Sequence, residues 1–410
     1  MTRAAHDQLA QALSTGIANG LLQPGAALPA QDERPWPVTL LTALGAWLAA
    51  VPLMGVVYTL LGDMVNKGLG TYVVGVLLLA GAVLVLRSRG VGSFVEQLAV
   101  SALLVGGAAL SYALVRDIDY SAAGVCLGVL ALSMAKVIPQ QWLRLLLGGA
   151  AALATLMALN PQRLFNGSDP GQLAFWFVLH SALLIWLGAI VAQHSDALLS
   201  RSPKAAAWLE PVSTGWLLLV LMGLCTWSGM TFMVSGSFSN TLQRELGQSQ
   251  MAWSPNSDWR LGAQAASSLL VMAAAGLAVR AWPSLRQAGV ALIVIEVALC
   301  ALSWFLPALG AALFAMAWTA TSQRWRLAAV SSMAAAWIVG SFYYQLNWTL
   351  ANKAALMVAL GAVIGAAAWW AGRSKISAEQ PGSSVQGKQA GVFIAFGVAL
   401  TLVVANCSIW

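Results

Sequence analysis

Residues 289–305, GVALIVIEVALCALSWF, form an apolar run that is interrupted by one charged side chain, Glu296. Similar runs recur along the chain, which is 59% hydrophobic and only 9% charged. Soluble domains carry about 25% charged residues, and polar groups must cover their outside. So much apolar surface requires the bilayer as its solvent. The sequence therefore predicts an all-α, polytopic transmembrane helix bundle.

Thirteen apolar runs are predicted to be spanning helices, with soft boundaries. The run at 309–322 is the weakest, because it is short and comes directly after Pro307. The predicted helices are 38–61, 68–86, 95–115, 120–136, 142–159, 173–193, 214–235, 261–279, 289–306, 309–322, 327–343, 351–371 and 390–406.

The distribution of basic residues predicts the orientation of these helices. Lys and Arg are enriched in short cytoplasmic loops. With thirteen helices and a cytoplasmic N-terminus, most of the 21 basic residues lie inside. The bias disappears if 289–322 crosses only once, so we predict two short helices that turn at Pro307 and a periplasmic C-terminus. Under this topology, the outside holds only Lys67, Arg116, Arg163, Arg244, Arg260 and Lys353.

The predicted organisation has four parts. Residues 1–37 form a cytoplasmic tail, in which leucine and isoleucine recur every fourth residue from Leu9 to Leu21, typical of a short amphipathic helix. Residues 38–373 form the bundle, 374–389 a flexible linker and 390–410 the final helix. The longest inside loop is predicted at 194–213 and the longest outside loop at 237–260.

Several function classes are excluded by what the sequence lacks. The net charge of +7 comes from scattered basic residues without a basic stripe, which argues against nucleic acid as a partner. The four cysteines lack metal-site spacing, and no phosphate-binding, dinucleotide or metal-hydrolase motif is present. His180 has aromatic and aliphatic neighbours and is predicted to be a hydrogen-bonded packing residue. No cofactor, metal or catalytic residue is predicted.

Glu296 is the sharpest single candidate for function. An ionised side chain in the middle of a spanning helix costs about 3 kcal/mol on insertion scales. Cys300 and Ser303 follow at spacings of four and seven, so Glu296 begins a weakly polar stripe. A proton-carrying or cation-binding carboxylate is one interpretation. The alternative is a neutral side chain that joins two helices by a hydrogen bond.

Small polar residues are concentrated in the second half of the chain. Gln264, Ser267 and Ser268 share a face of the helix predicted at 261–279. We therefore expect a polar cavity in this half rather than in the first. Ordinary packing is the alternative, because hydroxyl side chains commonly join membrane helices.

The stretch FYYQLNWTLANK, residues 342–353, is predicted to lie at the outer face. Tyr343, Tyr344 and Trp348 suit the headgroup level, where aromatic rings form an interfacial belt. Lys353 stands against the positive-inside trend, so a docking or substrate-binding lip that contains Lys353 is the functional interpretation. A purely structural belt remains the alternative.

Two segments resemble one known family. RPWPVTLLTALGAWLAAVPLMG (34–55) and SFYYQLNWTLANKAALMVALGAVIG (341–365) are similar to the opening and closing signatures of bacterial inner-membrane proteins catalogued as domain of unknown function 4401. The resemblance implies many spans, a place in the bacterial inner membrane and a companion: members are often encoded beside a membrane-anchored protein named for a Gly-Asp-Tyr…Leu…Tyr motif. It implies no reaction and no catalytic residues.

Three functions follow as hypotheses. The first is a non-enzymatic membrane component that works with another envelope protein through its periplasmic face. The second is a secondary transporter that uses Glu296. The weakest is an envelope enzyme acting on lipid or glycan through the 237–260 loop, which offers Arg244, Glu245, Asp258 and Arg260 but no recognisable catalytic pattern.

Overall fold

The computed structural model describes residues 69–88, 92–159, 171–193, 203–228, 258–282 and 290–345, together with isolated positions elsewhere. Within these ranges every regular element is an α-helix, which agrees with the predicted all-α class. The helices are α3 (Gly70–Arg87), α4 (Ser93–Asp117), α5 (Tyr120–Val137), α6 (Gln141–Ala158), α8 (Gly171–Gln193), α10 (Pro203–Trp227), α12 (Asp258–Ala281), α13 (Val290–Phe305), α14 (Leu309–Thr321) and α15 (Trp325–Gln345).

Seven of these helices are long and apolar enough to cross a bilayer: α3, α4, α5, α6, α8, α10 and α12. α13 and α14 are apolar but shorter. At a rise of 1.5 Å per residue, the 13 residues of α14 extend about 20 Å, less than the bilayer's hydrocarbon core of about 30 Å. The chain is therefore a membrane protein by length and composition of its helices, and α14 does not have the length of a full span.

One predicted boundary, the start of the helix predicted at 214–235, is wrong. The structure begins α10 at Pro203 rather than at 214, so half of the predicted inside loop is helical. Pro211 and Glu210 resemble loop residues, yet the helix continues through both. The end of α15 at Gln345 lies two residues beyond the predicted end at 343, within the soft boundaries of the prediction.

Apart from isolated positions, the remaining predicted segments lie outside the described residues. These are the tail, the linker, the final helix, Lys353 and most of the 237–260 loop. The isolated described positions from 11 to 18, from 41 to 55 and from 351 to 365 are helical.

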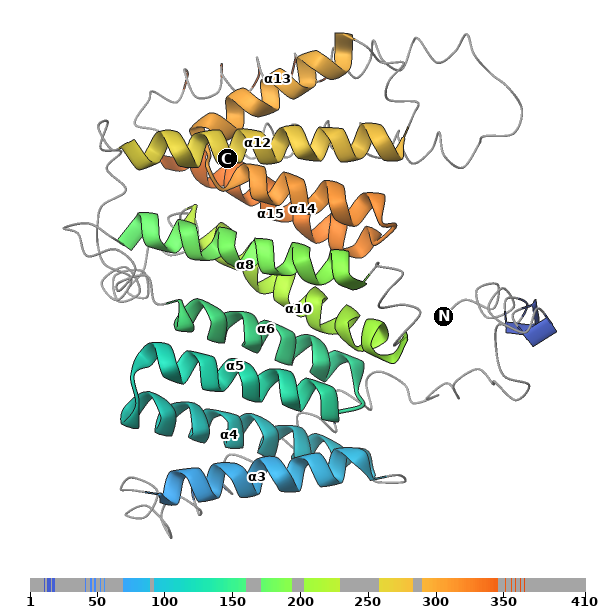
Figure 1. Cartoon of the computed structure of the whole chain (residues 1–410), viewed down its shortest axis with the longest axis vertical. Coiled ribbons are helices and arrows are strands. Elements are labelled where there is room, and N and C mark those ends of the chain that lie inside the picture. Colours follow the sequence, from blue (N-terminus) through green and yellow to red (C-terminus); the bar gives the residue numbers. More distant parts are fainter. Residues whose placement is uncertain are drawn as a thin grey trace. The chain divides into compact units, whose positions relative to one another are not determined.

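The chain divides into two compact units, Met1–Leu110 and Ser111–Trp410. In the first unit α3 crosses α4 closely, because a Cβ atom at Gly106 would come within 2.9 Å of the Gly75 carbonyl oxygen. In the second unit α6 packs between α5 and α10, and α10 also contacts α8 and α15. α14 then packs between α15 and α12, and α13 packs mainly on α12 (Figure 1).

The largest buried cluster belongs to the second unit. It combines Leu179 and Trp186 of α8, Leu217 of α10, Leu309 of α14 and Ile338 of α15, each at most 1% exposed. α14 is the most enclosed helix, since ten of its residues are buried. The candidate site described next lies beside this enclosed helix.

Candidate functional site

Glu296 lies on α13, half-buried, and its hydrogen-bond partner is one turn further along the same helix. The Cys300 thiol donates to Glu296 Oε1 across 3.7 Å. The same thiol lies 4.0 Å from the carbonyl oxygen of Ser268 on α12. Cys300 thus connects the intramembrane carboxylate of α13 to the backbone of α12.

Hydroxyl groups continue this connection. Ser268 Oγ and Ser303 Oγ are 3.3 Å apart, and Ser303 Oγ also donates to the Cys300 carbonyl at 2.9 Å. Ser303 is fully buried. The two polar stripes expected from the sequence therefore meet, and together they form one polar seam: Ser267, Ser268, Glu296, Cys300 and Ser303.

The seam ends at the turn between α13 and α14. Ser267 Oγ donates to the Leu306 carbonyl at 3.5 Å and accepts a hydrogen bond from the Gly310 backbone N–H at 3.1 Å. On the other side, Trp176 Nε1 of α8 donates to the Pro307 carbonyl at 3.5 Å. The turn residues 306–308 are thus held from α12 and from α8. This confirms that 289–322 forms two helices that turn at Pro307.

This turn lies level with residues inside the candidate membrane span of α12. α12 and α14 run parallel: Ser267 contacts Gly310, Ala274 packs with Phe314 and Ala317, and Trp282 packs with Ala320. Ser267 lies six residues, or about 9 Å, inside the candidate span Leu261–Ala281. Non-helical backbone is tolerated at such depth only where protein buries it or water reaches it, and here protein side chains satisfy it.

Gln264, the other candidate on α12, is 5% exposed and lies one turn before Ser267. It shares the buried face of α12 with Ser267 and Val271. The structure therefore places Gln264 one turn beyond the end of the seam that lies at the turn. Ser331 on α15 is fully buried, and its hydroxyl has no hydrogen-bond partner among the described residues.

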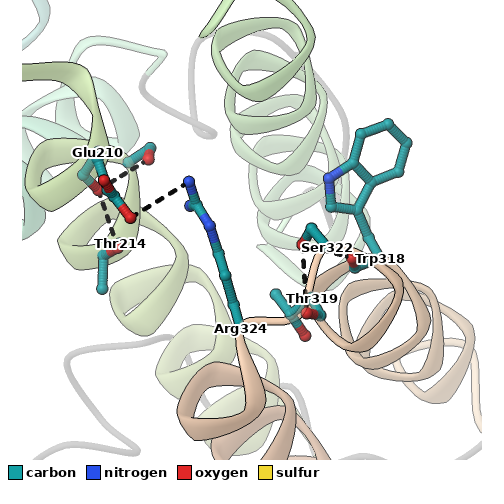
Figure 2. Close-up of polar contacts among 7 residues, drawn as sticks. Glu210, Thr214, Trp318, Thr319, Ser322 and Arg324 are labelled. Atoms are coloured by element: carbon teal, nitrogen blue, oxygen red, sulfur yellow. Dashed lines mark hydrogen bonds and ion pairs between the residues drawn. The ribbon is translucent and has the colours of Figure 1, made fainter. Parts of the chain in front are cut away.

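A second polar cluster was not expected from the sequence. Arg324 Nη2, just before α15, lies 3.5 Å from Glu210 Oε1 of α10 (Figure 2). The arginine side chain is 16% exposed and the glutamate 58%. The sequence signal was the opposite charge of Glu210 and Arg324, which lie in two segments that were both predicted to be inside. It was missed because Glu210 was assigned to a loop.

The end of α14 fixes the backbone of Arg324, one of the two residues of this ion pair. Figure 2 shows Ser322 and Thr319 at that end, where Ser322 Oγ donates to the Trp318 carbonyl at 2.8 Å. The Arg324 backbone N–H donates to the Thr319 carbonyl at 2.8 Å, and Gln323 has a φ of 62°. These are the features of a helix end that is closed by a left-handed residue. They fix the backbone from which the Arg324 side chain extends.

Other predicted residues have structural roles or fall outside the described part. His180 is hydrogen-bonded through Nδ1 to the Trp176 carbonyl at 2.8 Å and stacks on that ring at 3.9 Å, as predicted for a packing residue. The side chains of Tyr343 and Tyr344, and all of Lys353, lie outside the described residues.

The enzyme hypothesis gains no site from the described residues. Arg244 and Glu245 lie outside them, whereas Asp258 and Arg260 belong to the first turn of α12 rather than to a loop. Among the described residues, no three His, Cys, Asp or Glu side chains gather in a way that could hold a metal ion.

The helices and their apolar surfaces define a polytopic α-helical membrane protein. The family model described as "Domain of unknown function (DUF4401)" matches residues 35–374, so the chain belongs to that family. The match confirms the resemblance of the opening and closing segments. No curated protein and no solved structure matches the chain.

Proposed function

We propose that the protein is a secondary transporter that moves a proton or a small cation with Glu296 as the titrating or binding group. The observation that carries this proposal is the polar seam between α12 and α13, which continues from Glu296 to the turn at Pro307. Acidic residues within membrane helices are costly and commonly mark ion pathways and proton relays.

The chemistry of the seam fits a small positive ion. A carboxylate, a carbonyl and two hydroxyls are oxygen ligands, and each hydroxyl can also pass a proton along a hydrogen bond. The Cys300 thiol offers its hydrogen to the carboxylate and therefore favours an acceptor oxygen at that position. A proton or cation on Glu296 would neutralise its charge within the apolar part of the bundle.

Glu296→Gln tests this function. Gln preserves shape and hydrogen bonding but has no titrating proton, so the variant is expected to accumulate in the membrane and fold as the wild type does. Its pH-driven flux in proteoliposomes is expected to fall to that of empty vesicles. Glu96→Gln, an acid in the first turn of α4, is the matched control and should retain flux. Wild-type flux in Glu296→Gln would make Glu296 a structural residue.

We also propose, as a second candidate, that a companion envelope protein binds the outer face. The support is the sequence of residues 342–353, in which aromatic residues cluster next to Lys353, a cation against the positive-inside trend. Tyr344→Trp and Lys353→Arg preserve a simple aromatic belt. If these variants accumulate normally in the membrane but lose a crosslinked companion, residues 342–353 are a docking site. If crosslinking is unchanged, these residues form only a structural aromatic belt.

The proposed orientation has the N-terminus in the cytoplasm of a bacterial inner membrane, with a periplasmic C-terminus. The ion pair between Glu210 and Arg324 supports the same-side placement of two segments assigned to the inside. A reporter that is active only in the periplasm should work when fused at residue 410 or at residue 245, and should be silent at residue 380. Activity at 380 would contradict this orientation.

A further inference from the structure

The described hydrogen-bond partner of the Glu296 carboxylate is a thiol. Cys300, one turn later on α13, donates to Glu296 Oε1 across 3.7 Å, and the same sulfur lies 4.0 Å from the Ser268 carbonyl oxygen of α12. Hard cations such as Mg²⁺ and Ca²⁺ prefer oxygen ligands. The group that contacts the carboxylate is therefore a hydrogen-bond donor rather than a further oxygen ligand.

The hydroxyl groups of the polar seam lie too far along α13 to surround one ion together with the carboxylate. Ser303 follows Glu296 by seven residues, which is about 10 Å along the helix axis. Long helical side chains lean toward the helix N-terminus, so the Glu296 side chain does not shorten this separation. Oxygen ligands lie about 2.0–2.6 Å from Mg²⁺ or Ca²⁺, so two ligands of one ion are at most about 5 Å apart.

The seam is thus a row of groups and not a cage. The hydroxyls of Ser268 and Ser303 are 3.3 Å apart and are bonded to each other. The Ser303 hydroxyl also donates to the Cys300 carbonyl at 2.9 Å, and the Ser267 hydroxyl is bonded to the backbone of the turn. Each hydroxyl has a structural partner at its own level of the helix pair.

A softer metal ion also lacks its usual ligands in the part of the chain that the structure describes. Zn²⁺ and Cu⁺ are bound by sets of thiolates and imidazoles. Glu296 and Cys300 are only a pair, and no three His, Cys, Asp or Glu side chains gather among the described residues. The pair has the arrangement of a hydrogen bond rather than of a metal centre.

Among the described residues, the charged groups of the neighbouring helices lie away from the level of Glu296. α13 packs mainly on α12 and, at its end, on α14. α14 contains no titratable residue. Arg280 on α12 is exposed, and it lies twelve residues from Ser268, whereas Glu296 lies seven from Ser303. Arg280 is therefore five residues, or about 8 Å, beyond the level of Glu296. The other charged residues of α12, in its first turn, are Asp258 and Arg260.

We propose that the ion carried by Glu296 is a proton rather than a metal cation. This inference rests on the proposed transport function and names the ion of that same site. In the step, a hydronium ion gives its proton to a Glu296 oxygen, an O–H bond forms, water leaves, and the side chain becomes neutral. Nothing is oxidised or reduced. The Cys300 thiol keeps its hydrogen and holds Oε1, so Oε2 takes up the proton.

A proton suits a single carboxylate within an apolar helix. One proton cancels the whole charge of Glu296, whereas a hard metal cation needs six or more ligands around it. The neutral side chain avoids the cost of a charge at this depth. The thiol positions the carboxylate in its charged form, because it donates a hydrogen bond to Oε1.

Carbodiimide labelling measures the protonation of Glu296 without requiring transport. A lipid-soluble carbodiimide reacts with a protonated carboxyl group, and a metal cation that displaces the proton blocks the reaction. The full-length protein in liposomes is treated over a range of pH, in choline salt and in Na⁺, Li⁺, K⁺ or Mg²⁺ salts of equal ionic strength. Mass spectrometry then measures the label on the peptide that contains Glu296. Glu296→Gln identifies this label, and Glu96→Gln, on α4, is the matched control that should retain it.

The label on Glu296 is expected to decrease as the pH rises and to be equal in all salts at a given pH. Protection by any of the metal cations at constant pH would overturn the proposal, and so would a label that does not change with pH. If no label forms at any pH, infrared difference spectra between low and high pH decide. A protonated-carboxyl band that is present in the wild type and absent in Glu296→Gln supports the proposal, and the lack of such a band overturns it.

These outcomes are distinct from those that test the proposed function. If wild-type vesicles show no pH-driven flux, the transport function fails, whereas labelling that depends on pH and not on salt still identifies Glu296 as a proton-binding group. If flux is present but a metal cation protects Glu296 from the reagent, transport stands and the assignment of the proton fails.

Discussion

Two helix interfaces in the second unit are equally close but are built differently. At the α6–α10 interface, a Cβ atom at Gly215 would overlap the Leu145 carbonyl, and one at Gly148 would overlap the Val212 carbonyl. At the α12–α14 interface, Gly310 lies against Ser267 in the same way, but the Ser267 hydroxyl also bonds the partner backbone. One contact depends on shape alone, and the other on shape together with a specific hydrogen bond.

The difference distinguishes an interface that only holds helices together, α6–α10, from one that adjoins the candidate site, α12–α14. Small residues let membrane helices approach closely, and van der Waals contact then holds them together. Such a contact carries no polar group into the bilayer. The α12–α14 interface instead contains a buried polar side chain. The Ser267 hydroxyl forms hydrogen bonds with the backbone of the buried turn, which would otherwise lack partners. The polar seam has one end at this point, so the polar groups of α12 and α13 lie next to the turn that joins α13 to α14.

The largest expected effect breaks the first interface. Gly215→Leu forces α6 and α10 apart. The new side chain would overlap backbone atoms of α6, which cannot move aside as a flexible side chain could. Overpacking usually costs about 1–3 kcal/mol, and displacement of backbone should place this variant at or above that range. Gly188→Leu on α8 is the control, since a Cβ atom there meets nothing within 4 Å. Thermal unfolding in detergent measures both variants.

Equal stability of Gly215→Leu and Gly188→Leu would contradict the close contact of α6 with α10. A loss confined to Gly215→Leu, together with reduced accumulation in the membrane, would support it.

The sequence could predict much of this arrangement. Long apolar runs locate α5, α6 and α13 within one or two residues, because the bilayer imposes helix and length on any apolar segment. The start of α10 could not be found in this way. Pro211 and Glu210 weaken the apolar pattern, yet membrane helices tolerate proline, and α10 continues through both residues.

The candidate site was predictable in part. Helical spacing alone placed Cys300 and Ser303 in line with Glu296, and Ser267 beside Ser268. That the two stripes meet depends on which helices pack together, and no local pattern in the sequence specifies this. The ion pair between Glu210 and Arg324 also depends on which segments pack together, since Glu210 of α10 and Arg324, just before α15, are far apart in the chain.

The second prediction weakens the polar interface while preserving its shape. Ser267→Ala leaves the Gly310 N–H and the Leu306 carbonyl without their side-chain partner. Leaving buried polar groups unpaired costs about 1–3 kcal/mol, so the unfolding free energy should fall by that amount. Ser332→Ala is the control, because Ser332 is equally buried but bonds only the Ala328 carbonyl of its own helix.

The Ser332→Ala variant is expected to change stability by less than about 0.5 kcal/mol, since the carbonyl it releases keeps its helical partner. If the two serine variants lose the same stability, the hydroxyl of Ser267 is ordinary packing, and the contrast between the two interfaces disappears.

The smallest expected effect concerns the far end of α14, where the polar interface ends. Gln323 adopts a φ of 62°, a left-handed conformation that costs a non-glycine residue about 1–2 kcal/mol. Gln323→Gly removes this cost but increases the freedom of the unfolded chain, so a net gain of about 0.5–1 kcal/mol is expected. The Trp325 Nε1–Gln323 Oε1 bond at 3.2 Å would be lost, but it is exposed and contributes little.

Ser322→Gly is the control. Ser322 has a φ of −84°, so glycine relieves no backbone strain there, and the variant loses the hydrogen bond to the Trp318 carbonyl. It should therefore be destabilised. Stabilisation by Gly at 323 and destabilisation at 322, measured by thermal unfolding, would establish that backbone geometry closes α14. The reverse order would show that the Gln323 side chain holds this end.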